Sequence, residues 1–445
     1  MWNRLRLYTQ HESTAKKKLG RSLQFRLTSR CFALRLCTMK PILDTPYLSL
    51  VPKTDLHVHL DGSLRIPTLL ELADKQGIEL PGTTEEELNQ NVFKTHYTDL
   101  PEYLAGFQYT VAVMQTPESL ERIAKELAED NLAENVRYLE VRFAPQLHTS
   151  NGLSHKEILE AVTRGLRTAQ EKHNQSEAVR SGKELPFHFG IIVCALRWFF
   201  PGMSSYYANL FDVMPYAKER EVFAAASLEL ARASVALRDN EGLPIVGFDL
   251  AGAEAGNPAV DHSAAFLYAH RNFLQKTVHA GEAYGPESIF QALTECHADR
   301  IGHGTFLFNA GKVNSSNVKD PQRYVDQLTE TIARRRICVE INLTSNLQTL
   351  PEMTSLSDHP LGQMIDQNLS ATICTDNRLV SHTTVTRELE LAVKHFDLTP
   401  SQVKNLLVAG FKGSFYPGEY NERRRFIRQV IDRIEHLEKT ILETY

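Results

Sequence analysis

The sequence lacks the paired cysteines of a disulfide-rich or zinc-ribbon protein. Its six cysteines are scattered over 445 residues, and none of them stands in a CxxC pair. Free cysteine in an apolar segment behaves as a small hydrophobic residue, and three of the six lie in such segments: Cys194, Cys338 and Cys374. We therefore expect a protein of a reducing compartment, the cytoplasm, without a disulfide framework.

The sequence also lacks an excess of basic residues and a long apolar run, and each absence excludes one kind of partner. Acidic residues outnumber basic ones, 54 to 49, so the chain lacks the basic excess of nucleic-acid-binding proteins. No apolar run approaches the roughly 20 residues of a membrane-spanning helix. We therefore expect neither nucleic acid nor a membrane as a partner. With 42% hydrophobic and 23% charged residues, the composition is that of an ordinary globular protein.

The first forty residues differ from the rest, because they contain many arginines and lysines and a single acid, Glu12. Three interpretations are open: an organelle transit segment, a disordered basic arm, or sequence upstream of a working start at Met39. The continuous apolar core of a secretory signal is lacking. We favour the last two interpretations, describe residues 1–40 as a basic N-terminal extension, and assign residues 41–445 to a single domain.

After Pro41, short apolar segments alternate with longer amphipathic ones. Near-continuous Val, Ile, Leu and Phe are typical of parallel strands that are buried on both faces. Eight such segments separated by helices predict an α/β fold, the (β/α)₈ barrel. The predicted strands are 54–59, 137–143, 188–195, 244–250, 276–281, 300–303, 337–343 and 371–375. The long interval between the first two predicts a helical insertion after the first strand.

The stretch DLHVHLDGSLR, residues 55–65, places two histidines and an aspartate at alternate positions. Residues i, i+2 and i+4 of a strand share one face. His57, His59 and Asp61 are therefore expected to face one cavity, where both imidazoles could bind one metal ion. Two neighbouring histidines are more often ordinary surface or core residues, so the pair needs partners elsewhere in the chain.

Such partners lie at the ends of other predicted strands. In barrels of this kind the catalytic groups lie at the carboxyl ends of the strands and converge on one mouth. A lone histidine after a strand is commonly structural, but the recurrence of polar residues at equivalent positions is hard to explain by packing alone. The residues are Asp249 and Gly252 at the end of the fourth strand, His279 and Glu282 at the end of the fifth, His303 at the end of the sixth, and Asp376 and Asn377 at the end of the eighth.

These residues suggest a metal-assisted hydrolysis. Three imidazoles and a carboxylate suit one divalent first-row ion, zinc before others; they come from His57, His59, His279 and Asp376. The fourth strand segment, PIVGFDLAG, has no lysine that could bridge a second ion, so we expect one Zn²⁺ per chain. A carboxyl group in an apolar mouth has a raised pKa, so Glu282 can donate a proton. His303 can accept a proton from metal-bound water or hold the resulting hydroxide.

Six separated blocks between about Pro52 and about Leu391 carry a family resemblance. They are DLHVHLDGSLR, LPEYLAGF, YLEVRFAP, GFDLAGAE, HAGEAYGPESI with RIGHGT, and HPL followed by TDN. The chain resembles the adenosine deaminase family of the metallo-dependent amidohydrolase superfamily. The resemblance implies hydrolytic deamination of adenosine, and of 2′-deoxyadenosine, to inosine and ammonia by a zinc-activated hydroxide that attacks C6.

The resemblance also implies a role for each matching residue. His57, His59, His279 and Asp376 match the zinc ligands, Glu282 the acid that protonates purine N1, and His303 the histidine that positions the hydroxide. The backbone amide of Gly252 matches a contact to N3, and His59 and Asp61 match residues near the ribose 5′-hydroxyl. Leu100, Tyr103, Leu104 and Phe107 match an apolar lid helix over the pocket, although their spacing also fits ordinary helix packing.

The chain departs from the common family pattern at Asn377, where many members carry a second aspartate that must be protonated to donate to purine N7. An asparagine amide donates without that proton, and its alternative role is to cap the turn before Arg378. Asp61, if anionic, favours a neutral nucleoside over AMP. Open alternatives are deamination of adenine or a 5′-modified adenosine, and a non-catalytic zinc- and nucleoside-binding relative.

Overall fold

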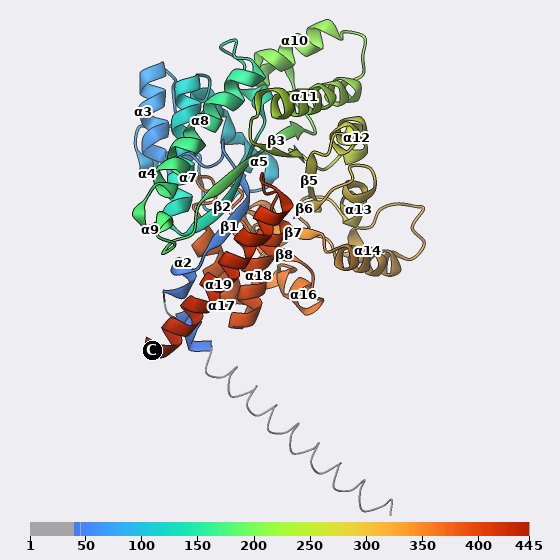
Figure 1. Cartoon of the computed structure of the whole chain (residues 1–445). Helices are drawn as coiled ribbons and strands as arrows, with labels where there is room; N and C mark the ends of the chain where they lie inside the picture. Colours follow the sequence, from blue (N-terminus) through green and yellow to red (C-terminus); the bar gives the residue numbers. More distant parts are fainter. Residues whose placement is uncertain (1–39, 45, 445) are drawn as a thin grey trace, which may run out of the picture.

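The eight predicted strands are confirmed in the computed structural model, which describes residues 40–44 and 46–444 (Figure 1). Residues 1–39 of the predicted extension lie outside the described part. The strands form one parallel sheet in the order β1 to β8. They are β1 (Lys53–His59), β2 (Val136–Phe143), β3 (His188–Leu196), β4 (Ile245–Ala251), β5 (Gln275–Ala280), β6 (Arg300–His303), β7 (Cys338–Ile341) and β8 (Ala371–Ile373).

The sheet closes between its first and last strands. Val58 of β1 and Asp376, just beyond β8, form a parallel bridge. The Asp376 amide donates to the His57 carbonyl, and the His59 amide donates to the Asp376 carbonyl, both at 2.7 Å. The fold is therefore the predicted (β/α)₈ barrel, and its closure uses three residues that the sequence singles out for metal binding.

Helices surround the barrel on its outer side (Figure 1). Many begin at a side-chain cap; for example, Ser154 accepts from the Glu157 amide in a capping box at the start of α8. The α-helices are α2 (Tyr47–Leu50), α3 (Ile66–Gln76), α4 (Glu85–Asn91), α5 (Leu100–Ala105), α6 (Phe107–Val113), α7 (Pro117–Ala133), α8 (His155–Asn174), α9 (Glu177–Arg180), α10 (Ser205–Val213), α11 (Glu219–Glu241), α12 (Ser263–Arg271), α13 (Pro286–Thr294), α14 (Pro321–Arg335), α15 (Leu343–Thr349), α16 (Leu361–Asp366), α17 (Val385–Phe396), α18 (Pro400–Gly413) and α19 (Tyr420–Thr444). Short 3₁₀ helices are η1 (Lys40–Asp44), η2 (Pro145–Leu147), η3 (Pro201–Met203), η4 (Ala259–His262), η5 (Ala310–Lys312) and η6 (Leu356–Asp358).

The helical insertion after the first strand is confirmed, since α3 to α7 all lie between β1 and β2. The segment predicted as one lid helix is divided at Gly106 into α5 and α6. The four apolar residues of that segment nevertheless line the cavity described below: Leu100, Tyr103, Leu104 and Phe107.

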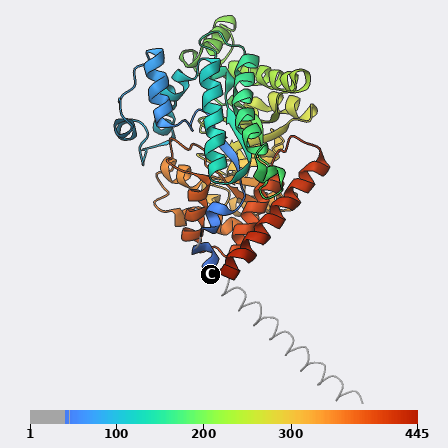
Figure 2. The same cartoon turned by 60° about the vertical axis from the view of Figure 1, so that its left-hand side comes forward.

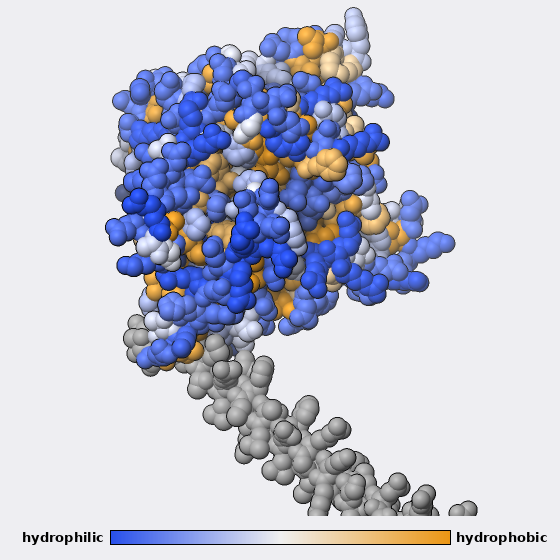
Figure 3. All heavy atoms as spheres, viewed as in Figure 1, coloured by the Kyte–Doolittle hydropathy of each residue, from blue (hydrophilic) through white to orange (hydrophobic). Residues whose placement is uncertain are grey.

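The two ends of the described chain pack together. Helix α19 contacts α2 and α18, and Figure 2 shows it lying diagonally beside the start of the barrel domain. The face seen in Figure 3 is mainly polar. Among the described residues, no helix is both long and apolar enough to cross a membrane. The cysteines of the described part are buried and free: Cys194, Cys296, Cys338 and Cys374.

Strand β2 carries charges into the barrel interior. All eight of its residues are buried, and they include Glu140 and Arg142, each with 0% exposure. A buried charge is stable only when it is paired and hydrogen-bonded. The partners of these two side chains lie directly beneath the candidate site.

Candidate functional site

A cavity of about 1320 Å³ opens at the carboxyl ends of the strands. Its lining brings together most of the residues predicted from the sequence, namely His59, Asp61, Gly252, His279, Glu282, His303, Asp376 and Asn377. Strand β1 ends at His59, so Asp61 lies in the following turn and not on the strand face that the alternation predicts. It lines the same cavity from that turn.

Four buried groups at the floor of the cavity could hold a metal ion. Their ligand atoms all lie within 4.8 Å of one another, and the groups are His57, His279, His303 and Asp376. A fifth group, His59, lies against this cluster: its Nε2 is 3.1 Å from His279 Nε2 and 3.4 Å from Asp376 Oδ1. All four predicted ligands therefore meet at one place, together with His303.

The chemistry of these atoms fits a cation. The Nε2 atoms of His57 and His303 are buried and have no hydrogen-bond partner among the described residues. His57 Nε2 lies 3.3 Å from Asp376 Oδ1. Burial disfavours the charge of Asp376, but His57 beside it holds the pKa of that carboxyl well below its ordinary value. Burial lowers the pKa of His59 well below its ordinary value, so its imidazole is neutral, as a metal ligand must be.

Two of these residues have an unusual backbone. His303 has φ 65° and Asp376 has φ 61°, in the left-handed region that non-glycine residues rarely adopt. Such a conformation costs about 1–3 kcal/mol and is found most often at functional sites. Here His303 ends β6 and Asp376 lies three residues beyond β8, and both belong to the cluster.

Carboxylates behind the histidines fix the orientation of two imidazoles. His57 Nδ1 lies 2.8 Å from Glu340 Oε2, and His279 Nδ1 lies 3.1 Å from Asp249 Oδ2. A ring nitrogen that donates to a carboxylate carries the proton, so the opposite nitrogen keeps its lone pair. The Nε2 lone pairs of His57 and His279 are therefore directed into the cluster.

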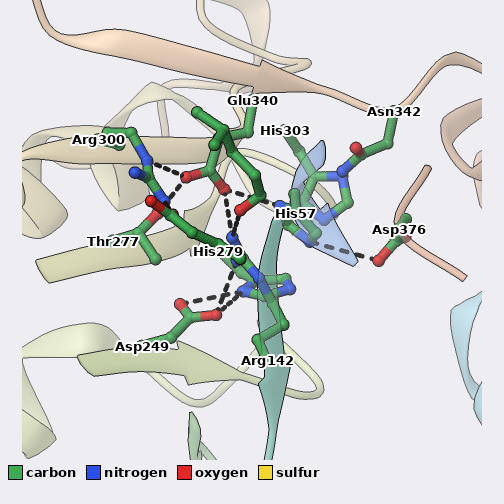
Figure 4. A network of polar contacts seen from close by, with 12 residues as sticks. His57, Arg142, Asp249, Thr277, His279, Arg300, His303, Glu340, Asn342 and Asp376 are labelled. Atoms are coloured by element: carbon green, nitrogen blue, oxygen red, sulfur yellow. Dashed lines mark hydrogen bonds and ion pairs between the residues drawn. The ribbon is translucent and has the colours of Figure 1, made fainter. Parts of the chain in front are cut away.

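Two buried arginines hold these carboxylates in place (Figure 4). Arg142 donates to Glu340 at 2.9 Å and to Asp249 at 2.8 Å. Arg300 donates to Glu340 at 2.5 Å and to Glu140 at 2.5 Å. Burial opposes ionisation of Glu340, but Arg142 and Arg300 hold the pKa of its carboxyl well below the ordinary value. Charges of alternating sign thus form a continuous chain inside the barrel and below the two histidines.

Replacement of Arg142 by methionine tests how much this chain of charges contributes to stability. The change leaves Glu340 and Asp249 buried without one of their cationic partners. Breaking a buried pair in this way costs about 3–5 kcal/mol, so we expect the free energy of unfolding in urea to fall by about that amount. The matched control is Arg65→Met, which removes a part-exposed pair with Asp130 and should cost at most about 1 kcal/mol. Equal stability of the two variants would contradict the prediction.

Glu282 lies beside His303, with its Oε2 3.7 Å from His303 Nε2. Burial raises the pKa of Glu282 to about 8. The loop that carries it is held by Glu254, whose carboxylate accepts the backbone N–H groups of residues 281 to 284 at 2.7–3.0 Å. A protonated carboxyl group is therefore held in a fixed position above the cluster.

The remaining predicted residues line the walls of the cavity. Gly252 has φ 93°, a conformation that glycine adopts without strain. Asn377 Nδ2 donates to the Tyr103 hydroxyl at 2.8 Å, while its Oδ1 is buried without a partner among the described residues. Gly62 permits this position, because a Cβ there would lie 1.8 Å from Asn377 Oδ1. Burial raises the pKa of Asp61 to about 7.

Comparison with known proteins agrees with this geometry. The family model described as adenosine deaminase matches residues 52–197 and 214–433. The chain belongs to the adenosine deaminase family. It is 35% identical to an adenosine deaminase of Mycobacterium avium over 87% of this chain and 96% of that one. It is 37% identical to adenosine deaminase 1 of Streptomyces coelicolor over 85% of this chain and 86% of that one.

Solved structures show the same fold. The Arabidopsis N6-mAMP deaminase is 26% identical, with a TM-score of 0.66, over 87% of this chain and 99% of that one. The adenine deaminase of Arthrobacter aurescens, at 23% identity and a TM-score of 0.67, shares the fold over 86% of this chain and 99% of that one. This adenosine deaminase family member is therefore a hydrolase that has a buried metal site of histidines and aspartate.

Several residues around the site of this family member were missed by reasoning from the sequence. Glu140 and Arg142 interrupt the apolar segment of β2, and Glu340 interrupts that of β7, so charge within a buried strand was an available signal. Glu254 and His359 lie in blocks that were noted only for their resemblance, GFDLAGAE and HPL. Their partners are distant in the sequence, and only the folded chain identifies them.

Proposed function

We propose that this chain deaminates adenosine, and 2′-deoxyadenosine, by hydrolysis to inosine and ammonia. The observation that carries the proposal is the position of Glu282 and His303, 3.7 Å apart and buried beside the metal-ligand cluster. A protonated acid and an imidazole at one place are what addition of water to a purine ring requires. A non-catalytic binding relative would have no need to keep both groups.

The cofactor that we propose is one zinc ion held by His57, His59, His279 and Asp376. Three imidazoles and a carboxylate form a donor set that zinc prefers. When bound, zinc lowers the pKa of water from about 15.7 to about 7 and so supplies the nucleophile. Glu340 and Asp249 keep two of the imidazoles in the tautomer that binds a cation.

Glu282 is proposed as the acid that protonates purine N1. Its carboxyl stays protonated at neutral pH, because burial raises its pKa to about 8. A proton on N1 withdraws electrons from C6 and makes that carbon more electrophilic. Glu254 contributes by holding the Glu282 loop, and the backbone amide of Gly252 is proposed to donate to N3 on the other edge of the ring.

The ribose end of the proposed substrate lies near His59 and Asp61. Arabidopsis ADAL, a structural relative at 26% identity, has been crystallised with GMP, so a nucleotide is the main alternative. Among the described residues that line the cavity, the sole Arg or Lys is Arg220, which is bound to the Gly256 carbonyl and to Asp261. A phosphate would meet the Asp61 carboxyl and no unpaired Arg or Lys among the described lining residues, which favours a neutral nucleoside.

The test is a parallel spectrophotometric assay of adenosine, 2′-deoxyadenosine, adenine and AMP with the purified, zinc-loaded chain. We expect the two nucleosides to be deaminated with kcat/KM at least 10²-fold above that of adenine and AMP. Preference for AMP or adenine would replace the proposed substrate but keep the reaction. Binding of adenosine without release of ammonia would support the non-catalytic alternative.

Asn377 is expected to donate its second amide hydrogen to purine N7, since the first is donated to Tyr103. A buried donor left without its acceptor costs about 1–3 kcal/mol. Wild-type protein should therefore discriminate against 7-deazaadenosine by about that amount in kcat/KM relative to adenosine. In Asn377→Ala most of this discrimination should disappear while zinc content is unchanged.

The matched control for this prediction is Asn131→Ala, because Asn131 is a buried asparagine of α7 that donates to the Leu127 carbonyl. This variant should discriminate between the two nucleosides as wild type does. If Asn377→Ala also discriminates as sharply as wild type, the N7 contact belongs to another residue.

A further inference from the structure

A chain of hydrogen bonds reaches His303 from behind the site. It starts at a backbone N–H group, which can only donate. The backbone N–H of Leu361 donates to His359 Nδ1 at 3.1 Å. A nitrogen that accepts carries no proton, so the proton of the His359 imidazole is on Nε2. His359 is buried and packs edge-on against Phe396. Burial lowers its pKa to about 3, so the ring is neutral.

The next link is Asn346, which lies on α15 and has no exposed surface. His359 Nε2 is 3.2 Å from Asn346 Oδ1. Because Nε2 carries the proton, it donates, and the amide oxygen of Asn346 accepts. This contact settles which end of the amide faces which neighbour, a choice that a side-chain amide leaves open when it is considered alone.

The last link is His303 itself. Asn346 Nδ2 lies 3.0 Å from His303 Nδ1. An amide NH₂ group donates and cannot accept, so His303 Nδ1 must accept and carries no proton. Asn342, four residues before Asn346 on the same helical face, offers a second amide at 3.3 Å. The ring proton of His303 is therefore on Nε2, the nitrogen that faces the cluster and has no hydrogen-bond partner among the described residues.

We propose that His359 and Asn346 are positioning residues that fix the tautomer of His303, so that its Nε2–H donates to the oxygen that attacks the substrate. The inference rests on the proposed hydrolysis. A donor held in place where negative charge develops stabilises the transition state without reorganisation. In this tautomer His303 has no lone pair directed at the cavity, so it neither accepts the proton of water nor binds the metal ion.

The tautomer of His303 also decides which of the five groups at the cavity floor can be metal ligands. A ring nitrogen that carries a proton cannot be a metal ligand. Removing His303 from the set leaves the three other histidines and the aspartate: His57, His59, His279 and Asp376. His303 thus belongs to the reaction and not to the metal centre, although one of its ring nitrogens lies within 4.8 Å of ligand atoms of His57, His279 and Asp376.

The test begins with the tautomer itself. The full-length, zinc-loaded protein is labelled with ¹⁵N-histidine, and long-range ¹H–¹⁵N correlation spectra separate protonated from unprotonated ring nitrogens. His303 is assigned by the signals that disappear in His303→Gln. We expect protonated Nε2 and unprotonated Nδ1 in wild type. A proton on Nδ1 would overturn the proposal, and this result does not depend on which substrate the protein accepts.

The variant Asn346→Asp should then reverse the tautomer of His303 with little change in the shape of the side chain at position 346. The carboxylate can only accept, so we expect the proton of His303 to move to Nδ1, while zinc content and KM stay near wild type. Because a transition-state donor is lost, kcat should fall by about 10²–10³-fold. The matched control is Asn131→Asp, a buried amide outside the cavity, which should leave both the spectrum and kcat unchanged. A moved proton together with wild-type kcat would overturn the catalytic role of the tautomer.

His359→Phe provides a second variant in case Asn346→Asp does not fold. It removes the donor that orients Asn346, so the amide can rotate and both tautomers of His303 should appear in the spectrum. Loss of a supporting residue of this kind costs about 10–100-fold in activity, and we expect kcat to fall within that range at unchanged zinc content. A single Nε2–H tautomer of His303 in this variant would show that His359 does not help to fix that tautomer.

Discussion

Replacement of Glu282 by glutamine is expected to lower kcat by about 10²–10⁴-fold while zinc content stays the same. Glutamine keeps the shape of the side chain but cannot transfer a proton, and a positioned general acid contributes a factor of that size. Steady-state assays with adenosine measure kcat, and metal analysis of the same preparation measures the zinc content. An exposed substitution on α14, Glu330→Gln, is the control and should leave both values unchanged.

The pH dependence of the wild type gives an independent measure of the same group. The pKa of Glu282 is raised to about 8 by burial, so the carboxyl can donate a proton below that pH and loses this ability as the pH rises through it. A bound cation lowers the pKa of a neighbouring acid, so the alkaline limb of kcat/KM is expected at or below pH 8. Glu282→Gln should lack this limb. Near-normal turnover in the variant would mean that another residue protonates the ring.

Replacement of His57 by alanine is expected to remove the metal ion and the activity together. His57 is fully buried, and its Nε2 lone pair is directed into the cluster by the Glu340 contact at 2.8 Å. Wild type should carry about one zinc per chain, and the variant should carry almost none. Turnover should fall to the background of the assay, because the nucleophile is no longer formed at neutral pH.

Stability gives a second measurement for this prediction, separate from activity. A ligand that binds only the folded state raises the midpoint of thermal unfolding. Removal of metal with a chelator should therefore lower the midpoint of wild type and leave that of His57→Ala unchanged. His262→Ala is the matched control, since His262 is a buried histidine bound to Ser227 outside the cavity. A metal-free preparation of wild type with full activity would contradict the metal centre altogether.

The order of strands and helices could be predicted from the sequence because it depends on local periodicity. The apolar segments that became β1 to β8 were visible as short runs between amphipathic stretches, and their ends differ from the predicted ones by only a few residues. The (β/α)₈ barrel then follows, because few topologies accommodate eight parallel strands with a helix after each. The division of the lid segment at Gly106 was missed, since its apolar spacing continues across the break.

The residues at the cavity floor could also be predicted from the sequence. A position after a strand is a local property, and parallel strands bring all such positions to one end of the barrel. His59, Glu282 and Asp376 were therefore expected to meet before their contacts were known. Asp61 was expected there for the wrong local reason, because it lies in a turn and not on the strand.

Only the tertiary structure decided which atoms of these residues are free to react. Glu340 lies 283 residues from the histidine that it orients, and Asn346 lies 43 residues from His303. No periodicity links such pairs, because their contacts depend on the angle between neighbouring strands and on the side chain that each rotamer meets. The sequence thus determined which groups come to the site, whereas the hydrogen bonds made behind the site determined which nitrogen of each imidazole keeps its lone pair.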